Sequence, residues 1–157
     1  MLYRIDPERP APRKVRPAVD AVERGQVIIY PTDTGYAFGC APSSSRGIQT
    51  LRRLKGVPEK DQKPLAMLVG SFSDIGRYGR LGTQAFRTMR RLLPGPYTLV
   101  LRSTKEVPRA MQNRRNEVGL RLPDHAVCSM LVEELGGPLL TGSVTPAEEP
   151  PELEDPE

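Results

Sequence analysis

Small hydroxyl side chains and cations lie at or near the ends of the predicted strands and helices of this chain. They are Thr32, Thr34, Lys55, Arg121, Thr141, Ser143 and Thr145. In open α/β sheets, ligands gather at the carboxyl ends of the strands. Hydroxyls and cations suit phosphate oxygens, because both donate hydrogen bonds and the cations add charge assistance. Each residue alone also has a structural explanation, since threonines are common in turns and a lysine that ends a helix complements the helix dipole.

Other chemistries have few residues to work with. The chain has one histidine, His125, and two isolated cysteines, Cys40 and Cys128. Without a second histidine or a C-x-x-C pair, the sequence offers neither a metal site nor a Cys/His nucleophile, and no phosphate-binding P-loop motif occurs. We expect His125 to be a surface or helix-capping group and both cysteines to be buried free thiols.

Charge is distributed unevenly along the 157 residues. The net charge is +4, but the last twelve residues carry six acids and no base. Residues 1–145 therefore hold 23 basic and 13 acidic side chains, a net charge of +10. A body of this charge attracts phosphate groups of nucleotides or nucleic acids. The alternative is that the charge only keeps the surface solvated.

The composition favours a cytoplasmic protein with no membrane partner. No apolar run approaches the ~18 residues that a membrane span needs. The N-terminal residues 1–6 have no apolar segment of a secretory signal.

The elements that position these residues alternate between helix and strand, which indicates an α/β fold. We predict helices at residues 17–24, 45–55, 74–78, 83–93 and 124–135, and strands at 26–30, 65–69, 97–101, 118–122 and from 139. Pro31 is expected to end the first strand, followed by a loop through Gly35 and Gly39. Residues 1–15 are predicted to be an extended basic arm, residues 16–145 the domain, and residues 146–157 an acidic, proline-rich tail that we expect to be disordered.

Several stretches of the chain, in order, resemble the motifs of the YrdC/YciO family. They are Ile29–Cys40 (IYPTDTGYAFGC), Leu51–Gly56 (LRRLKG), Lys63–Leu68 (KPLAML), Leu93–Leu101 (LPGPYTLVL), Gly119–Pro123 (GLRLP) and Pro138–Ser143 (PLLTGS). Together they cover roughly residues 16–145. The stretch Thr104–Arg109 (TKEVPR) is more similar to the YciO branch.

This resemblance implies a twisted, mixed α/β sheet with helices, YrdC/RibB-like, around a basic concave pocket. It also implies a threonylcarbamoyl-AMP synthase that uses ATP, with or without Mg²⁺, L-threonine and bicarbonate to prepare the t6A modification of tRNA. By position, Thr32 and Thr34 would line the threonine side, Lys55 would contact phosphate, and Arg121 would hold a carboxylate or carbamate. Thr141, Ser143 and Thr145 would lie against nucleotide and substrate.

Two positions depart from the family pattern. Val57 stands where the family has the arginine of its K-x-R motif, and Thr145 stands for the asparagine of S-x-N. An apolar side chain in place of a forked cation removes charge where an anion should bind. The alternative is therefore a YciO-like protein that binds double-stranded RNA or nucleotide with little or no synthase activity. The family also continues with a further strand, whose absence would leave a sheet edge suited to homodimer formation.

Overall fold

The computed structural model of the protein describes residues 1–56 and 65–144. Its helices are α1 (Pro12–Glu23), α2 (Ser45–Lys55), α3 (Phe72–Tyr78), α4 (Thr83–Leu92) and α5 (Ala126–Leu135), with a 3-10 turn at Arg109–Met111. Its strands are β1 (Ile28–Thr32), β2 (Gly35–Cys40), β3 (Ala66–Leu68), β4 (Thr98–Arg102), β5 (Glu117–Arg121) and β6 (Leu139–Ser143). Val57, Thr145 and the predicted tail lie outside the described residues.

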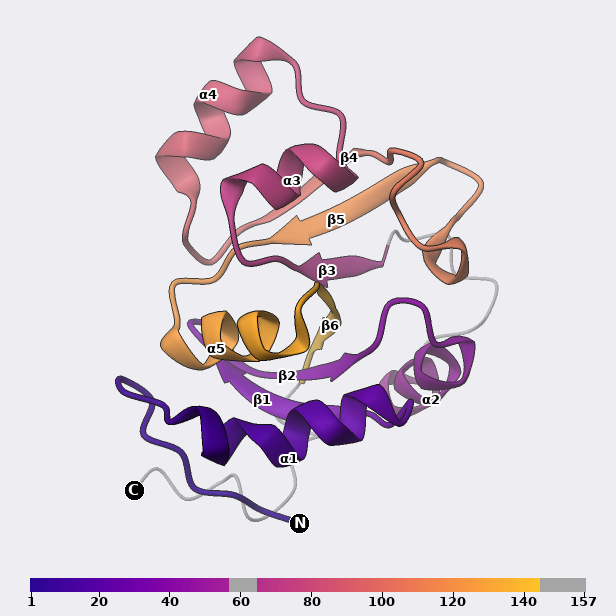
Figure 1. Ribbon diagram of the computed structural model, residues 1–157. Helices are drawn as coiled ribbons and strands as arrows, with labels where there is room; N and C mark the ends of the chain where they lie inside the picture. The colour runs from indigo at the N-terminus through magenta and orange to yellow at the C-terminus, as the bar shows by residue number, and fades with distance from the viewer. Residues whose placement is uncertain (57–64, 145–157) are drawn as a thin grey trace.

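The strands form a single mixed sheet in the order β1-β2-β6-β3-β5-β4. Within the described residues, β3 and β5 pair in parallel and the other neighbouring strands pair in antiparallel fashion. Figure 1 shows this sheet twisted, with α1 and α5 lying together on one side of it. The predicted mixed α/β class is confirmed.

Alternating side chains of the strands build two cores, one on each face of the sheet. On one face, α1 and α5 pack against Tyr30, Ala37, Leu68 and Leu139. On the other face, residues of α2, α3 and α4 pack with Phe38, Met67, Leu120 and Leu140. Arg121 follows Leu120 in β5, so its side chain lies on the face that α1 and α5 cover.

Helix α1 begins at Pro12, five residues earlier than predicted, and the extended arm is correspondingly shorter than residues 1–15. Pro12 takes the first turn, where its missing N–H costs nothing, and Pro17 lies inside the helix. The buried face explains the difference. Val15, Val19 and Val22 are spaced four and three apart and all are buried, so the stripe starts before Pro17.

The predicted loop after the first strand is wrong, because residues 35–40 form β2. Strand β1 runs through Pro31 and pairs with β2 as a hairpin, with Thr32 opposite Gly35. Pro31 is tolerated because β1 is an edge strand of the sheet and the proline needs no ladder partner on its open side. Gly35 has φ +125°, a conformation that residues with a side chain rarely adopt. The hairpin turn is therefore Asp33-Thr34.

The helix ends agree more closely with the sequence. Ser44 caps α2 by accepting from the N–H of Gly47, and Gly56 ends it in the left-handed conformation. Asp124, the predicted cap of α5, is not the cap. His125 takes that place, accepting from the N–H of Val127 through Nδ1 at 3.1 Å, which confirms the predicted capping role of the histidine. No helix among the described residues is long and apolar enough to span a membrane.

Candidate functional site

The hairpin turn between β1 and β2 is closed by the hydroxyl of Thr32. Its Oγ1 donates to the carbonyl of Gly35 at 2.7 Å and accepts from the N–H of Thr34 at 3.1 Å. The donor proton of Thr32 is thereby used within the turn. Thr34, which is exposed, has its own hydroxyl 3.2 Å from that of Thr32. Of the two predicted threonines, Thr32 is buried and Thr34 is exposed.

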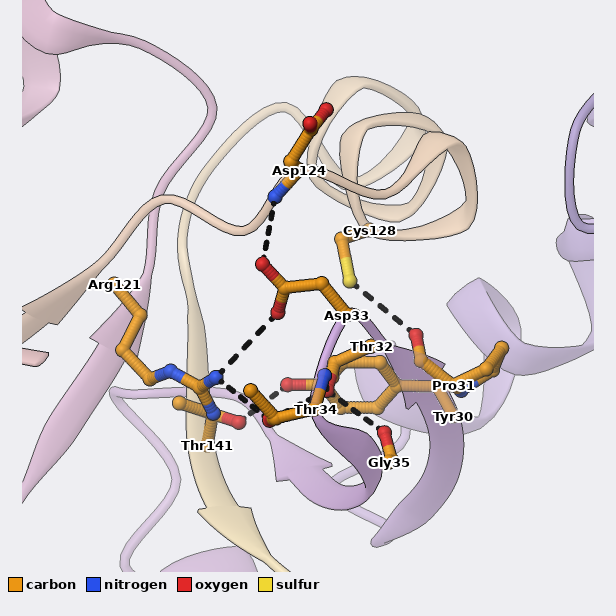
Figure 2. Close-up of polar contacts among 10 residues, drawn as sticks. All are labelled: Tyr30, Pro31, Thr32, Asp33, Thr34, Gly35, Arg121, Asp124, Cys128 and Thr141. Atoms are coloured by element: carbon orange, nitrogen blue, oxygen red, sulfur yellow. Dashed lines mark hydrogen bonds and ion pairs between the residues drawn. The ribbon is translucent and has the colours of Figure 1, made fainter. Parts of the chain in front are cut away.

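Arg121 reaches this turn from β5. One terminal nitrogen of its guanidinium donates to Thr34 Oγ1 at 3.2 Å and lies 3.8 Å from a carboxylate oxygen of Asp33. The other oxygen of Asp33 accepts from the N–H of Asp124 at 3.1 Å (Figure 2). Asp33 is exposed when the whole residue is counted, but its side chain is only 14% exposed. Asp33 thus fixes both the arginine and the segment that precedes α5.

The guanidinium of Arg121 is not fully satisfied by these contacts. Arg121 is 6% exposed, and its Nε is the one buried side-chain nitrogen or oxygen of the described residues without a hydrogen-bond partner. A buried donor left unpaired costs about 1–3 kcal/mol, and more when the group is charged. The arrangement can therefore gain free energy from an anionic ligand that accepts from Arg121.

Thr141 lies on the same face of the sheet and is also buried, at 5% exposed. Its hydroxyl forms a hydrogen bond with the phenol of Tyr30, which comes from β1. Burial raises the pKa of Tyr30 well above its ordinary value, so the phenol stays neutral. Figure 2 shows Tyr30 and Thr141 in the same cluster as Arg121 and the hairpin turn.

Lys55 and Ser143 form a second group. The ammonium group of Lys55, at the end of α2, donates to the backbone carbonyl of Ser143 at the end of β6. It also lies 5.9 Å from the centroid of the Phe38 ring, which belongs to the face opposite Arg121. Lys55 therefore approaches the carboxyl end of β6 from the other side of the sheet.

The two cysteines are buried free thiols, as predicted. Burial raises the pKa of both Cys40 and Cys128 to about 12. Cys128 donates through its thiol to the carbonyl of Pro31 at 3.3 Å, which ties α5 to β1. A thiol with so high a pKa holds almost no thiolate, the reactive form, at neutral pH.

The structure therefore places Thr32, Thr34 and Arg121 around one turn. Thr141 lies with Tyr30 on the same face of the sheet, and Lys55 contacts Ser143 at the end of β6. Thr145 lies outside the described residues. The sequence prediction did not include Asp33, Tyr30 or Asp124 among the site residues. Asp33 stands between two predicted threonines, which was a usable signal. The roles of Tyr30 and Asp124 depend on contacts across the sheet that no local pattern shows.

The chain matches the model of the family Sua5_yciO_yrdC, described as "Telomere recombination", over residues 20–157. The match covers most of the chain, so the chain belongs to the Sua5/YciO/YrdC family. The resemblance predicted from the motifs is confirmed.

Two curated relatives show where the chain stands in this family. It is 36% identical to the uncharacterised protein YciO of Escherichia coli over 143 residues, which are 90% of this chain and 68% of YciO. It is 38% identical to threonylcarbamoyl-AMP synthase of Homo sapiens over 125 residues, 80% of this chain. The chain spans 44% of the human enzyme's length.

Solved structures of the family have the same fold. The crystal structure of E. coli YciO superposes with a TM-score of 0.86 at 34% identity, covering 92% of this chain and 69% of YciO. The structure of P. abyssi Sua5 complexed with L-threonine superposes with a TM-score of 0.77 at 28% identity. That match covers 87% of this chain and 40% of Sua5.

Proposed function

We propose that this protein is a threonylcarbamoyl-AMP synthase-like enzyme that uses ATP, L-threonine and bicarbonate, and so acts in tRNA t6A modification in the cytoplasm. The observation that carries the proposal is the buried guanidinium of Arg121 with its unpartnered Nε. A forked cation of this kind binds carboxylates. The relatives that are synthases, and the Sua5 neighbour complexed with L-threonine, support a carboxylate as its ligand.

The proposed reaction needs no protein nucleophile. Threonine and bicarbonate give a carbamate and water, a carbamate oxygen forms a bond to the α-phosphorus of ATP, and pyrophosphate leaves with the electrons of the broken bond. The protein contributes by positioning the reactants and stabilising negative charge. We assign the carboxylate or carbamate to Arg121 and Thr34, and the phosphates to Lys55, with Thr141 and Ser143 nearby.

We expect Mg²⁺ to enter with the triphosphate. The described residues contain no group of three or more His, Cys, Asp or Glu side chains that could hold a metal ion. Mg²⁺ is commonly bound through substrate phosphates, with few protein ligands.

The test is adenylate formation by the purified protein from ATP, L-threonine and bicarbonate, followed by pyrophosphate release. Arg121→Lys keeps the charge but loses the fork, so we expect the rate to fall at least tenfold. The matched control is Arg115→Lys, an exposed arginine in the turn before β5, which should leave the rate unchanged. No pyrophosphate release by the wild type, or equal rates for both variants, would contradict the proposal.

A second candidate is a protein that binds nucleotide or double-stranded RNA and catalyses little. It is favoured by exposed arginines on two helices. These are Arg46 and Arg53 of α2, and Arg87, Arg90 and Arg91 of α4. Such side chains can contact phosphates of a duplex without reading its sequence. Binding of duplex RNA by a protein that forms no adenylate would favour this candidate over the synthase.

A further inference from the structure

Tyr30 has no role in the function proposed so far, although its hydrogen-bond partner Thr141 is one of the residues placed near the phosphates. Among the described residues, and apart from tyrosines and cysteines, the buried polar or charged side chains are Thr32, Arg121 and Thr141. Thr32 closes its own turn and Arg121 contacts that turn. Thr141 instead forms a hydrogen bond with Tyr30 of β1, which lies two strands away in the sheet. Tyr30 is 3% exposed.

Gly39 of β2 makes this contact possible. Gly39 lies directly opposite Thr141 in the pairing of β2 with β6. A Cβ atom at Gly39 would lie 2.8 Å from Cε1 of Tyr30 and 2.6 Å from a methyl carbon of Leu139. The tyrosine ring therefore lies across the glycine and reaches Thr141 over the intervening strand. On the other side, Thr141 stands opposite Ala66, which is also small.

The hydrogen bond between Tyr30 and Thr141 leaves one proton unused. Each hydroxyl has one proton, either oxygen can donate, and the bond uses one of the two protons. Burial keeps the phenol of Tyr30 protonated. Both side chains are buried, so the unused proton lacks an acceptor among the hydrogen bonds of the described residues, which is costly. A ligand oxygen that accepts from Thr141 would remove this cost and select the arrangement in which Tyr30 donates.

The surroundings of Thr141 favour an anion as the acceptor of that proton. The positive charge of Arg121 is close enough to act on the Tyr30 phenol, where it lowers the pKa against the larger effect of burial. Arg121 also presents its unpartnered Nε on the same face of the sheet. Positive potential and two unused donors on one face together suit a ligand oxygen with negative charge.

We infer that Tyr30 is a positioning residue, which donates to Thr141 and thereby directs the Thr141 hydroxyl proton to an oxyanion of the bound ligand. The inference rests on the proposed function. The group that accepts from Thr141 is an oxyanion, either the carboxylate of L-threonine or a phosphate of ATP. Measuring the binding of each ligand separately distinguishes the two.

The experiment is calorimetric titration of L-threonine and of ATP into the wild type, Tyr30→Phe, Thr141→Val, Thr141→Ser and the double variant Tyr30→Phe/Thr141→Val. We expect Tyr30→Phe to weaken one ligand about three- to tenfold, the range of one hydrogen bond, and to leave the other unchanged. Thr141→Ser should retain affinity. The double variant should bind as Thr141→Val does, because Tyr30 acts only through Thr141.

The matched control is Tyr78→Phe, a buried tyrosine of α3 at 6% exposed. A merely structural role would change the melting temperature of a tyrosine variant but not ligand affinity. Equal affinities of the wild type and Tyr30→Phe for both ligands, or additive losses in the double variant, would overturn the inference alone. A wild-type protein that bound neither ligand would refute the proposed function and the inference with it.

Discussion

At the scale of single residues, the site is built around a charge that the protein has removed from water. Arg121 is 6% exposed and is balanced by Asp33 at 3.8 Å, a contact too long for an ideal ion pair. Burying an ion pair costs several kcal/mol per ion, which imperfect geometry does not repay. This is why we assign the anion of the proposed reaction to Arg121.

Lys55 provides a prediction at this scale. Its ammonium group lies at the end of β6, where we place the phosphates. We expect Lys55→Ala to weaken ATP binding about tenfold or more, because a charge-assisted contact contributes roughly 1.5–3 kcal/mol. Titration calorimetry measures the change. The control Lys105→Ala, at an exposed position after β4, should bind ATP as the wild type does. Equal losses in both variants would contradict the role of Lys55.

At the scale of elements, two errors of the sequence prediction involve proline. The sequence predicts that Pro17 starts a helix and that Pro31 ends a strand, because proline is common in the first turn of a helix and rare inside strands. In the structure Pro17 is inside α1 and Pro31 inside β1. Burial of Val15 extends the helix, and the edge position of β1 removes the cost of the missing N–H. Tertiary context therefore outweighed local propensity at both prolines.

The earlier start of α1 is testable through Val15. Its side chain is fully buried in the core between α1 and α5, so Val15→Ala should lower the free energy of unfolding by about 2 kcal/mol. Lys14→Ala, at the exposed neighbouring position, should change it by less than about 0.5 kcal/mol. Urea unfolding followed by circular dichroism measures both. A neutral Val15→Ala would mean that residues before Pro17 do not pack as a helix.

At the scale of the whole molecule, the positive charge indicates how the protein would bind RNA, if the second candidate function is the right one. The chain carries a net charge of +10 over residues 1–145. Arg87, Arg90 and Arg91 of α4 are exposed. Aromatic residues make up 5% of the chain and tryptophan is absent, so a stacking platform for single strands is not expected. Any RNA binding would then depend on phosphates and on duplex shape.

This leads to a prediction for RNA. Fluorescence anisotropy across a salt series should show that affinity for duplex RNA exceeds that for single strands and falls steeply with salt. Replacing Arg87, Arg90 and Arg91 with alanine should reduce the slope of log K against log salt by about 3, roughly one for each lost phosphate contact. A flat salt response, or tighter binding of single strands, would exclude this mode.

The sequence by itself determined the features that depend on near neighbours. The helical spacing of α2 and α4, the serine cap and glycine end of α2, the apolar runs that became β3, β4 and β5, and the family motifs were all visible in it. These signals are local, because helix and strand periodicity and capping involve residues within a few positions of each other.

Only the tertiary structure decided which of the candidate residues act together. Arg121 meets Thr34 across 87 residues, and Tyr30 meets Thr141 across 111. These contacts depend on strand order and register, which are set by packing both faces of the sheet rather than by any local pattern. The same packing turned Thr32 inward to close its turn, left Arg121 with an unpartnered nitrogen, and brought Lys55 to β6 from the opposite face.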